Sequence, residues 1–185
     1  MERPLRTLAS NLILALLTAV LLSGCVGPRA ALQMEATRTD SKIASLQVRL
    51  KGLGMNTDPD EARQAAETAV TYALRLAAEY RVATPARWHN LLIQMGFRDR
   101  GLCFHWTEDM MKHLMALNLK TFQLHWGVAH KGSDLREHNS VVITALNQPL
   151  ENGLVLDPWR NAGDLYWAAV NQDSYPWEPL PPDQW

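Results

Sequence analysis

The chain has 185 residues, of which 47% are hydrophobic and 20% are charged, and its formal net charge is −1. A charge near zero without a cluster of Lys and Arg argues against a nucleic-acid-binding protein. The 2 Cys are too few for a disulfide scaffold or a Cys-rich zinc site, and the apolar fraction is too high for a mainly disordered chain. The length suits one domain with a substantial core.

The N-terminal segment has the pattern of a secretory signal. Arg3 and Arg6 form a basic region, and an apolar run over residues 12–22 follows, which is too short to span a bilayer comfortably. The run ends in Leu22-Ser23-Gly24-Cys25, which resembles the bacterial lipobox. The resemblance implies cleavage before Cys25 and acylation of its sulfur. An ordinary signal peptide and an uncleaved N-terminal anchor are the alternatives.

Cleavage at this point makes residues 1–24 a lipoprotein signal peptide, and the acylated Cys25 makes the lipid bilayer a partner of the chain. Each of these alternatives places the domain outside the cytoplasm. In enterobacterial lipoproteins an Asp after the acylated residue favours retention in the inner membrane, whereas this chain has Val26. We therefore expect a protein of the bacterial cell envelope, lipid-anchored in the outer membrane and facing the periplasm.

Residues 25–57 are predicted to form a lipidated tether followed by a short helix. The segment from Gly27 to about Thr39 is polar with scattered apolar residues. Beyond it, a 3-4-3 spacing places four apolar residues on one helical stripe: Ile43, Leu46, Leu50 and Leu53. The stripe fits a helix that packs on the domain better than a piece of coiled coil.

Three further helices are predicted, over residues 59 to about 82, 84–95 and 102–117. The first has a strong start, with Asp58 as its N-cap and Pro59 at the first helical position. Glu61 can close a capping box with this N-cap. The second helix ends at Gly96, which suits the C-terminal end of a helix.

The pattern changes to strands after the last helix. Three strands are predicted, over residues 122–128, 138–146 and 154–156, the first of them from a clear alternation of apolar and polar residues. Helices followed by antiparallel strands define an α+β fold. The last stretch, residues 158–185, is rich in Trp, Tyr and Pro and is predicted to wrap around the surface.

Cys103 is the thiol that remains in the mature chain if Cys25 carries lipid. It lies where a loop enters a helix, and backbone N–H groups there favour the thiolate and can stabilise an oxyanion. A cysteine nucleophile needs a base and an orienting partner. His138 starts the second strand and Asp157 ends the third, so a hairpin would bring them to about the same level on one face. These residues are the candidate catalytic triad, and no cofactor is expected.

Three motifs in this order resemble those of the transglutaminase-like cysteine hydrolases of the papain-like superfamily: Gly101-Leu102-Cys103-Phe104, His138-Asn139-Ser140-Val141-Val142 and Leu154-Val155-Leu156-Asp157-Pro158. The resemblance spans roughly residues 87–159 and implies that residues 58–185 form a papain-like, transglutaminase-like domain. It also implies a thiol hydrolase or acyl transferase that acts on an amide bond of a peptide, protein or cell-wall substrate.

The chain departs from the pattern of this family in several places. Asn139 and Ser140 follow the His where the family often has an aromatic residue, and Trp159 replaces the small polar residue that commonly follows Asp-Pro. A side-chain donor for the oxyanion is not obvious, and Gln94 and Asn90 are the candidates.

Other residues near the motifs have two interpretations. Trp106 and Trp159 are candidates for a substrate groove, since aromatic side chains bury a large area with few rotatable bonds, but the C-terminal Trp residues could instead cover the sheet. Arg98 and Arg100 could bind a substrate carboxylate or be solvated loop charges.

Competing hypotheses concern the whole site. Cys103 could be a buried structural thiol. Six residues could act as metal ligands: His105, Asp109 and His113 on one helical face, with Cys103, His125 and His130. The helical set spans about 12 Å, too far for one ion, and no metal is expected. The same fold could also serve, without catalysis, as a binding or assembly subunit of an envelope complex. The sequence does not predict an oligomeric state.

Overall fold

The computed structural model describes residues 27–185. Residues 27–38 and residues 39–185 belong to two different units, and all features discussed below belong to the second unit unless stated. The predicted signal peptide and Cys25 lie outside the described residues. Between residues 27 and 185, no helix combines the length and the apolar character needed to cross a membrane.

In the described part of the chain, four helices precede the sheet: α2 (Pro28–Lys51), α3 (Pro59–Glu79), α4 (Ala86–Gln94) and α5 (Cys103–Met115). The prediction of a tether as far as about Thr39 is wrong for residues 28–39, because α2 is continuous from Pro28. The segment contains many strong helix formers and no Gly or Pro after its first residue, which explains the longer helix. The other three helices agree with the predicted ones to within a few residues.

The start of α3 confirms one predicted contact and corrects another. The side chain of Asp58 accepts hydrogen bonds from the backbone N–H groups of Asp60 and Glu61, at 2.8 and 2.9 Å. Glu61 does not close a capping box. Its carboxylate accepts from the backbone N–H groups of Lys120 and Thr121, at 2.7 and 2.8 Å, and so ties the helix to the start of the sheet.

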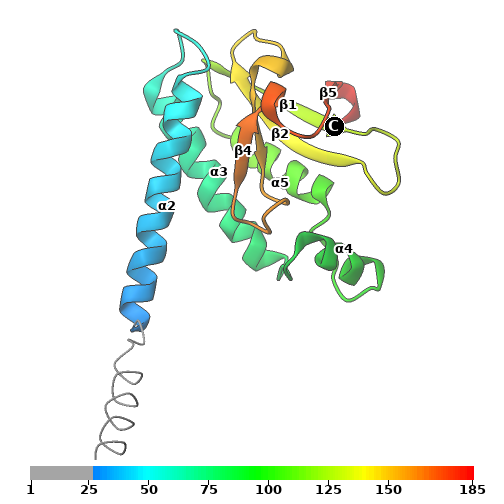
Figure 1. Cartoon of the computed structure of the whole chain (residues 1–185). Helices are drawn as coiled ribbons and strands as arrows, with labels where there is room; N and C mark the ends of the chain where they lie inside the picture. The colour runs from blue at the N-terminus through cyan, green and yellow to red at the C-terminus, as the bar shows by residue number, and fades with distance from the viewer. Residues whose placement is uncertain (1–26) are drawn as a thin grey trace, which may run out of the picture. The chain divides into compact units, whose positions relative to one another are not determined.

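The sheet has five antiparallel strands in the order β4-β3-β2-β1-β5 (Figure 1). Their bounds are β1 (Phe122–Ala129), β2 (His138–Ala145), β3 (Leu154–Asp157), β4 (Tyr166–Ala169) and β5 (Trp177–Leu180). Three short 3-10 helices accompany them: η1 (Leu150–Asn152), η2 (Val170–Gln172) and η3 (Pro182–Gln184). Helices followed by an antiparallel sheet confirm the α+β prediction.

The C-terminal stretch differs from its prediction, because β4 and β5 extend both edges of the sheet instead of merely wrapping the surface. Each strand has only four residues, too few for a periodic pattern. Within β5, Pro179 lies opposite Gly127 of β1. Proline lacks the N–H that a second neighbour would require, so it suits an edge strand.

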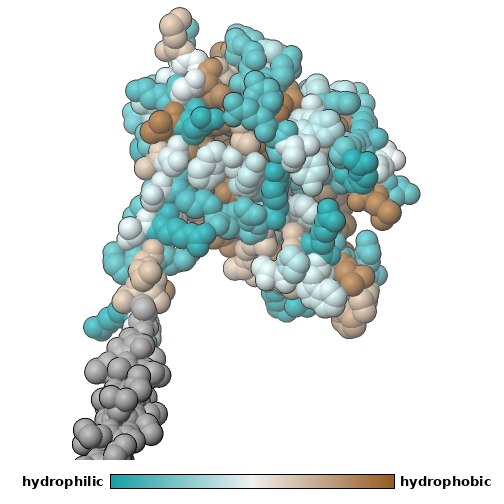
Figure 2. Space-filling view, in the orientation of Figure 1, coloured by the Kyte–Doolittle hydropathy of each residue, from teal (hydrophilic) through white to brown (hydrophobic). Residues whose placement is uncertain are grey.

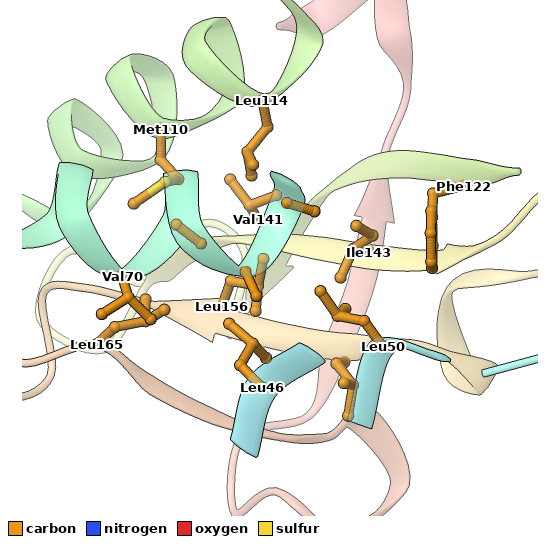
Figure 3. Packing of buried hydrophobic residues seen from close by; sticks show 14 of the residues in the cluster. Leu46, Leu50, Val70, Met110, Leu114, Phe122, Val141, Ile143, Leu156 and Leu165 are labelled. Atoms are coloured by element: carbon orange, nitrogen blue, oxygen red, sulfur yellow. The ribbon is translucent and has the colours of Figure 1, made fainter. Parts of the chain in front are cut away.

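The main core lies between the helices and one face of the sheet (Figure 3). Leu46 and Leu50 of α2, Met110 and Leu114 of α5, and Ile143 of β2 all meet there. The buried face of α3 consists mostly of alanines: Ala62, Ala65, Ala66, Ala69 and Ala73. These small side chains allow the helix to approach its neighbours closely, and burial of the whole cluster stabilises the fold by about 25 cal/mol for each Å² of apolar surface removed from water. A smaller cluster, which includes Val142, Val155 and Trp177, covers the other face.

Candidate active site

Cys103 is the first residue of α5, as the sequence predicts. The preceding turn is held by His105, whose Nδ1 accepts hydrogen bonds from the backbone N–H groups of Gly101 and Leu102, both at 3.2 Å. Burial, assisted by the positive charge of Arg100, lowers the pKa of His105, so its ring stays neutral at pH 7 and can accept these bonds. The turn therefore presents the sulfur at a fixed helix N-terminus.

Gly101 is required by both the backbone and the packing of this turn. Its φ is 121°, and a Cβ there would lie 2.3 Å from Nε2 of His89. His89 is buried; its Nδ1 accepts from the N–H of Ala83 at 3.2 Å, so its Nε2 carries the proton and donates to the carbonyl of Arg100 at 2.9 Å. His89 thus packs against the loop that delivers the sulfur, a role that no motif in the sequence indicates.

Trp106 also supports this turn, and its predicted place in a substrate groove is wrong. Its side chain is 1% exposed, and its indole N–H donates to the carbonyl of Gly101 at 2.9 Å. It packs edge-on against Tyr80 in a small core cluster. Because Cys103 and Trp106 are three residues apart on one helix, the indole braces the helix start from the core side.

His138 and Asp157 face each other across β2 and β3, with a register shifted from the expected one. Val141 pairs with Leu156, so Asp157 lies opposite Ser140, and His138 is its diagonal neighbour on the same face. The side chains bridge the diagonal: Nε2 of His138 lies 2.7 Å from Oδ2 of Asp157. The structure therefore brings together His138 and Asp157, the pair that the hairpin argument predicts.

The imidazole of His138 connects the carboxylate to the thiol. Burial by itself lowers the pKa of His138, but hydrogen bonds to Asp157 and Cys103 and the charges of these groups outweigh it and raise the pKa to about 9. Since Nε2 is bonded to Asp157, Nδ1 remains for the sulfur. At neutral pH the ring is protonated and can donate from both nitrogens.

Arg160 completes the surroundings of the carboxylate and was missed by the sequence reasoning. Its backbone N–H binds Oδ1 of Asp157 at 3.0 Å, and its Nε binds Oδ2 at 3.0 Å. The far side of the guanidinium makes two further bonds with Asp173, at 2.9 and 2.8 Å. Burial raises the pKa of Asp173, but the bonds to Arg160 and Trp177 outweigh this and lower it. Asp157 therefore both caps the turn after Pro158 and orients His138.

Aromatic rings enclose the imidazole of His138. Ring centroids of Trp159 and Tyr175 lie 4.8 Å from it, and that of Trp177 lies 5.5 Å away. The indole of Trp159 also donates to Oδ1 of Asn90 at 3.1 Å. The C-terminal aromatic residues thus keep water from most of the ring, and Trp159 is placed where the groove hypothesis puts it.

A pocket of about 340 Å³ opens beside the thiol. Its lining comes from α4, from the start of α5 and from the loop between β1 and β2, and includes Arg87, Asn90, Cys103, Arg136, Glu137, His138 and Trp159. A larger hollow of about 420 Å³, between the end of α2 and η1, lies elsewhere and contains no nucleophilic side chain. Leu91 of α4 and Met95, directly after this helix, are exposed. Figure 2 shows hydrophobic surface in the region of α4.

The candidate oxyanion donors have different outcomes. The prediction of Gln94 as an oxyanion donor is wrong, since Gln94 is exposed at the end of α4 and does not line the pocket. Asn90 does line it, but its Oδ1 is bound to Trp159. The amide closest to the sulfur belongs to Asn139, whose Nδ2 lies 4.0 Å from Sγ of Cys103. Its orientation is fixed because the indole of Trp126, which can only donate, binds Oδ1 at 2.7 Å.

The other candidate residues have different partners. Asp109 accepts from Tyr80 and Arg100, while the ring of His113 stacks on Tyr72 with centroids 3.5 Å apart. Within residues 27–185, no group of three or more His, Cys, Asp or Glu side chains is arranged to hold a metal ion. Arg100 pairs with Glu108 and Asp109, and Arg98 binds the carbonyls of Phe97 and Arg81, so neither faces the thiol pocket.

No protein-family model, curated protein or solved structure matches this chain. The interpretation of the site therefore depends on its own geometry.

Proposed function

We propose that this protein is a lipid-anchored thiol hydrolase or acyl transferase of the bacterial envelope that acts on an amide bond. The observation that carries the proposal is the chain of contacts from Cys103 through His138 to Asp157, which joins a helix start to two neighbouring strands. A nucleophile, a base and an orienting carboxylate in contact, beside an open pocket, are the parts that covalent acyl transfer requires.

The chemistry follows from the protonation of His138. The Cys103 thiolate attacks the carbonyl carbon of the amide and forms a C–S bond, and the electron pair of the C=O bond moves to oxygen. When the tetrahedral intermediate collapses, the C–N bond breaks and the imidazolium of His138 gives its proton to the leaving amine. Water then attacks the thioester, with His138 taking the proton, and releases the acid. An amine in place of water gives acyl transfer.

Asn139 and the helix start supply the charge stabilisation in this proposal. The oxyanion would lie next to the sulfur, between the amide N–H of Asn139 and the unpaired backbone N–H groups at the first turn of α5. Asn139 is 8% exposed and held by Trp126, so its dipole is already oriented before substrate arrives. It takes the role that the sequence assigned to Gln94 or Asn90.

The order of the three residues along the fold supports a papain-like, transglutaminase-like domain. The nucleophile opens a helix packed on an antiparallel sheet, the base begins the central strand, and the carboxylate ends the adjacent one. Asn139 and Trp159, which depart from the family's motifs, both have positions in the site: one at the sulfur and the other over the imidazole. The substrate in this proposal is a peptide, a protein side-chain amide or a cell-wall peptide.

The reactivity of the thiol tests the proposal. The full chain, in detergent, is treated with iodoacetamide at neutral pH, and the alkylated peptide is identified by mass spectrometry. We expect Cys103 to react in the folded protein, and His138→Ala to slow the reaction by about tenfold or more, because the adjacent imidazolium is lost. Lys112→Gln is the control, because Lys112 is exposed on α5 and does not line the thiol pocket. A thiol that reacts only after denaturation would contradict the proposal and favour a non-catalytic binding or assembly subunit.

A further inference from the structure

Two arginines line the thiol pocket from different elements. Arg87 is in the first turn of α4, and Arg136 is in the loop between β1 and β2. The pocket also contains the sulfur of Cys103, so a ligand that reaches the nucleophile enters the field of both guanidinium groups.

The charges of these arginines are not neutralised by the protein. Among residues 27–185, no carboxylate lies within ion-pair distance of Arg87 or Arg136. The guanidinium of Arg136 contacts Nε2 of His130 at 3.3 Å. By contrast, Arg100 and Arg160 each bind two carboxylates.

The one acidic side chain of the pocket offsets only part of this positive charge. Glu137 follows Arg136 in the chain, but its Oε2 accepts the backbone N–H of Gly132 at 2.7 Å, which holds it within its own loop. Asn90 adds donors, since Trp159 binds its Oδ1 and leaves its NH₂ group for a ligand. Two guanidinium groups against one carboxylate leave the pocket with a net positive charge from these side chains. Together with the amide donor of Asn90, they form a surface that favours an anion.

We infer that the pocket binds a free carboxylate of the acyl substrate, close to the bond that Cys103 attacks. The inference rests on the proposed function and specifies its substrate class. Guanidinium groups bind carboxylates through paired, charge-assisted hydrogen bonds, and two of them from different elements would fix the substrate relative to the sulfur. The carboxylate is either the C-terminus of a peptide or an acidic side chain next to the scissile amide.

Two alkylating reagents of the same size test this binding without a known substrate. Iodoacetate carries a carboxylate where iodoacetamide carries a neutral amide, and both alkylate Cys103. We expect the ratio of the iodoacetate rate to the iodoacetamide rate to fall by about fivefold or more in Arg87→Gln and in Arg136→Gln, and less at high salt. Because His138 is unchanged in both variants, its charge does not contribute to the difference.

Arg98→Gln is the matched control, because Arg98 binds only backbone carbonyls among its described partners and does not line the pocket. It should leave the ratio unchanged. A ratio that is unchanged by both pocket substitutions overturns the inference while leaving the proposed function in place. Loss of all alkylation in the folded wild-type chain would instead reject the proposed function.

Protection of Cys103 from iodoacetamide separates the two sources of carboxylate. Protection by acetyl-alanyl-alanine, but not by its C-terminal amide, identifies a peptide C-terminus. Protection by acetyl-alanyl-glutamyl-alanine amide identifies an acidic side chain. No protection by any of these peptides, at concentrations up to their solubility, overturns the inference.

Discussion

His138 and Arg160 bind the same atom, Oδ2 of Asp157, at 2.7 and 3.0 Å. The carboxylate is 0% exposed, so its charge is balanced by these two groups alone among the side chains described. Arg160 fixes the plane of the carboxylate, and the carboxylate in turn fixes the imidazole. The position of His138 therefore depends on a residue that does not line the thiol pocket.

Substitution of Arg160 should destabilise the fold. Arg160→Met removes a partner of two carboxylates, and we expect the free energy of unfolding in urea to fall by about 3 kcal/mol, because the buried side chain of Asp173 loses its ion-pair partner and Asp157 keeps only His138. Arg75→Met is the control, since the ion pair of Arg75 with Glu79 is solvent-exposed. Equal stabilities for the two variants would show that the Arg160 network is not structural.

The raised pKa of His138 predicts that stability depends on pH. The folded-state pKa of about 9 exceeds the ordinary value of 6.5, so protonation favours the folded state. Its contribution is complete below the unfolded pKa and is lost as the pH rises through the folded one. We expect the free energy of unfolding to decrease by up to about 3 kcal/mol between about pH 6 and pH 10. The same loss of acid should reduce amide hydrolysis above about pH 9.

Urea titrations at several pH values check this dependence. His138→Gln, which cannot titrate, should show a much flatter profile over the same range. A wild-type profile as flat as that of the variant would mean that Asp157 and Cys103 do not hold the ring in its protonated form.

Two glycines with positive φ provide a matched test of the turn before Cys103. Gly101→Ala places a methyl group against Nε2 of His89, whereas Gly96→Ala meets open space. Both incur left-handed backbone strain of about 1 kcal/mol, but Gly101→Ala should cost at least about 2 kcal/mol more and should slow alkylation of Cys103. Similar thermal unfolding of both variants would show that His89 does not brace the turn.

Asn139 can be separated from the nucleophile because alkylation creates no oxyanion. With p-nitrophenyl acetate as the probe, Asn139→Ala should lower kcat by about a hundredfold, while iodoacetamide alkylation of Cys103 changes far less. Gln94→Ala is the control, since Gln94 lies outside the pocket. An unchanged kcat in Asn139→Ala would remove the amide from the mechanism.

The two cysteines allow the lipid anchor to be tested independently of the site. Cys25→Ser should abolish labelling by a radioactive fatty acid and release the protein from the membrane fraction. Cys103→Ser should still be labelled and should stay in the membrane fraction. Labelling that persists in Cys25→Ser would contradict the prediction of a lipoprotein. It would not contradict the proposed role of the Cys103 site.

Sequence patterns sufficed where the local signal and the tertiary structure agree. Asp58 and Pro59 predict the start of α3, and the alternation from Phe122 predicts β1, because capping and strand burial are local properties. The motif order and the expected hairpin group Cys103, His138 and Asp157, and the structure places them together. The hairpin argument tolerates a small register error because diagonal residues share a face.

Contacts between distant segments were not predictable in the same way. The bonds from Glu61 to Thr121 and from Arg160 to Asp173 depend on how separate elements pack. The four-residue strands β4 and β5 have no period long enough to detect, and Pro179 argues against a strand unless the edge position is known. Asn139 gave no signal because its role depends on Trp126 across the hairpin.

The position of β2 at the centre of the sheet has a consequence for local unfolding. Val141, Val142 and Ile143 are paired on both edges, with β1 and with β3, so their amides open only when two ladders break. His138, at the start of β2, pairs with Ala129 of β1 and lies outside the ladder with β3, and Cys103 is the first residue of α5. The ends of elements open more easily than their centres. Hydrogen exchange should therefore find the centre of β2 among the slowest regions of the chain and the amides at His138 and Cys103 among the faster ones.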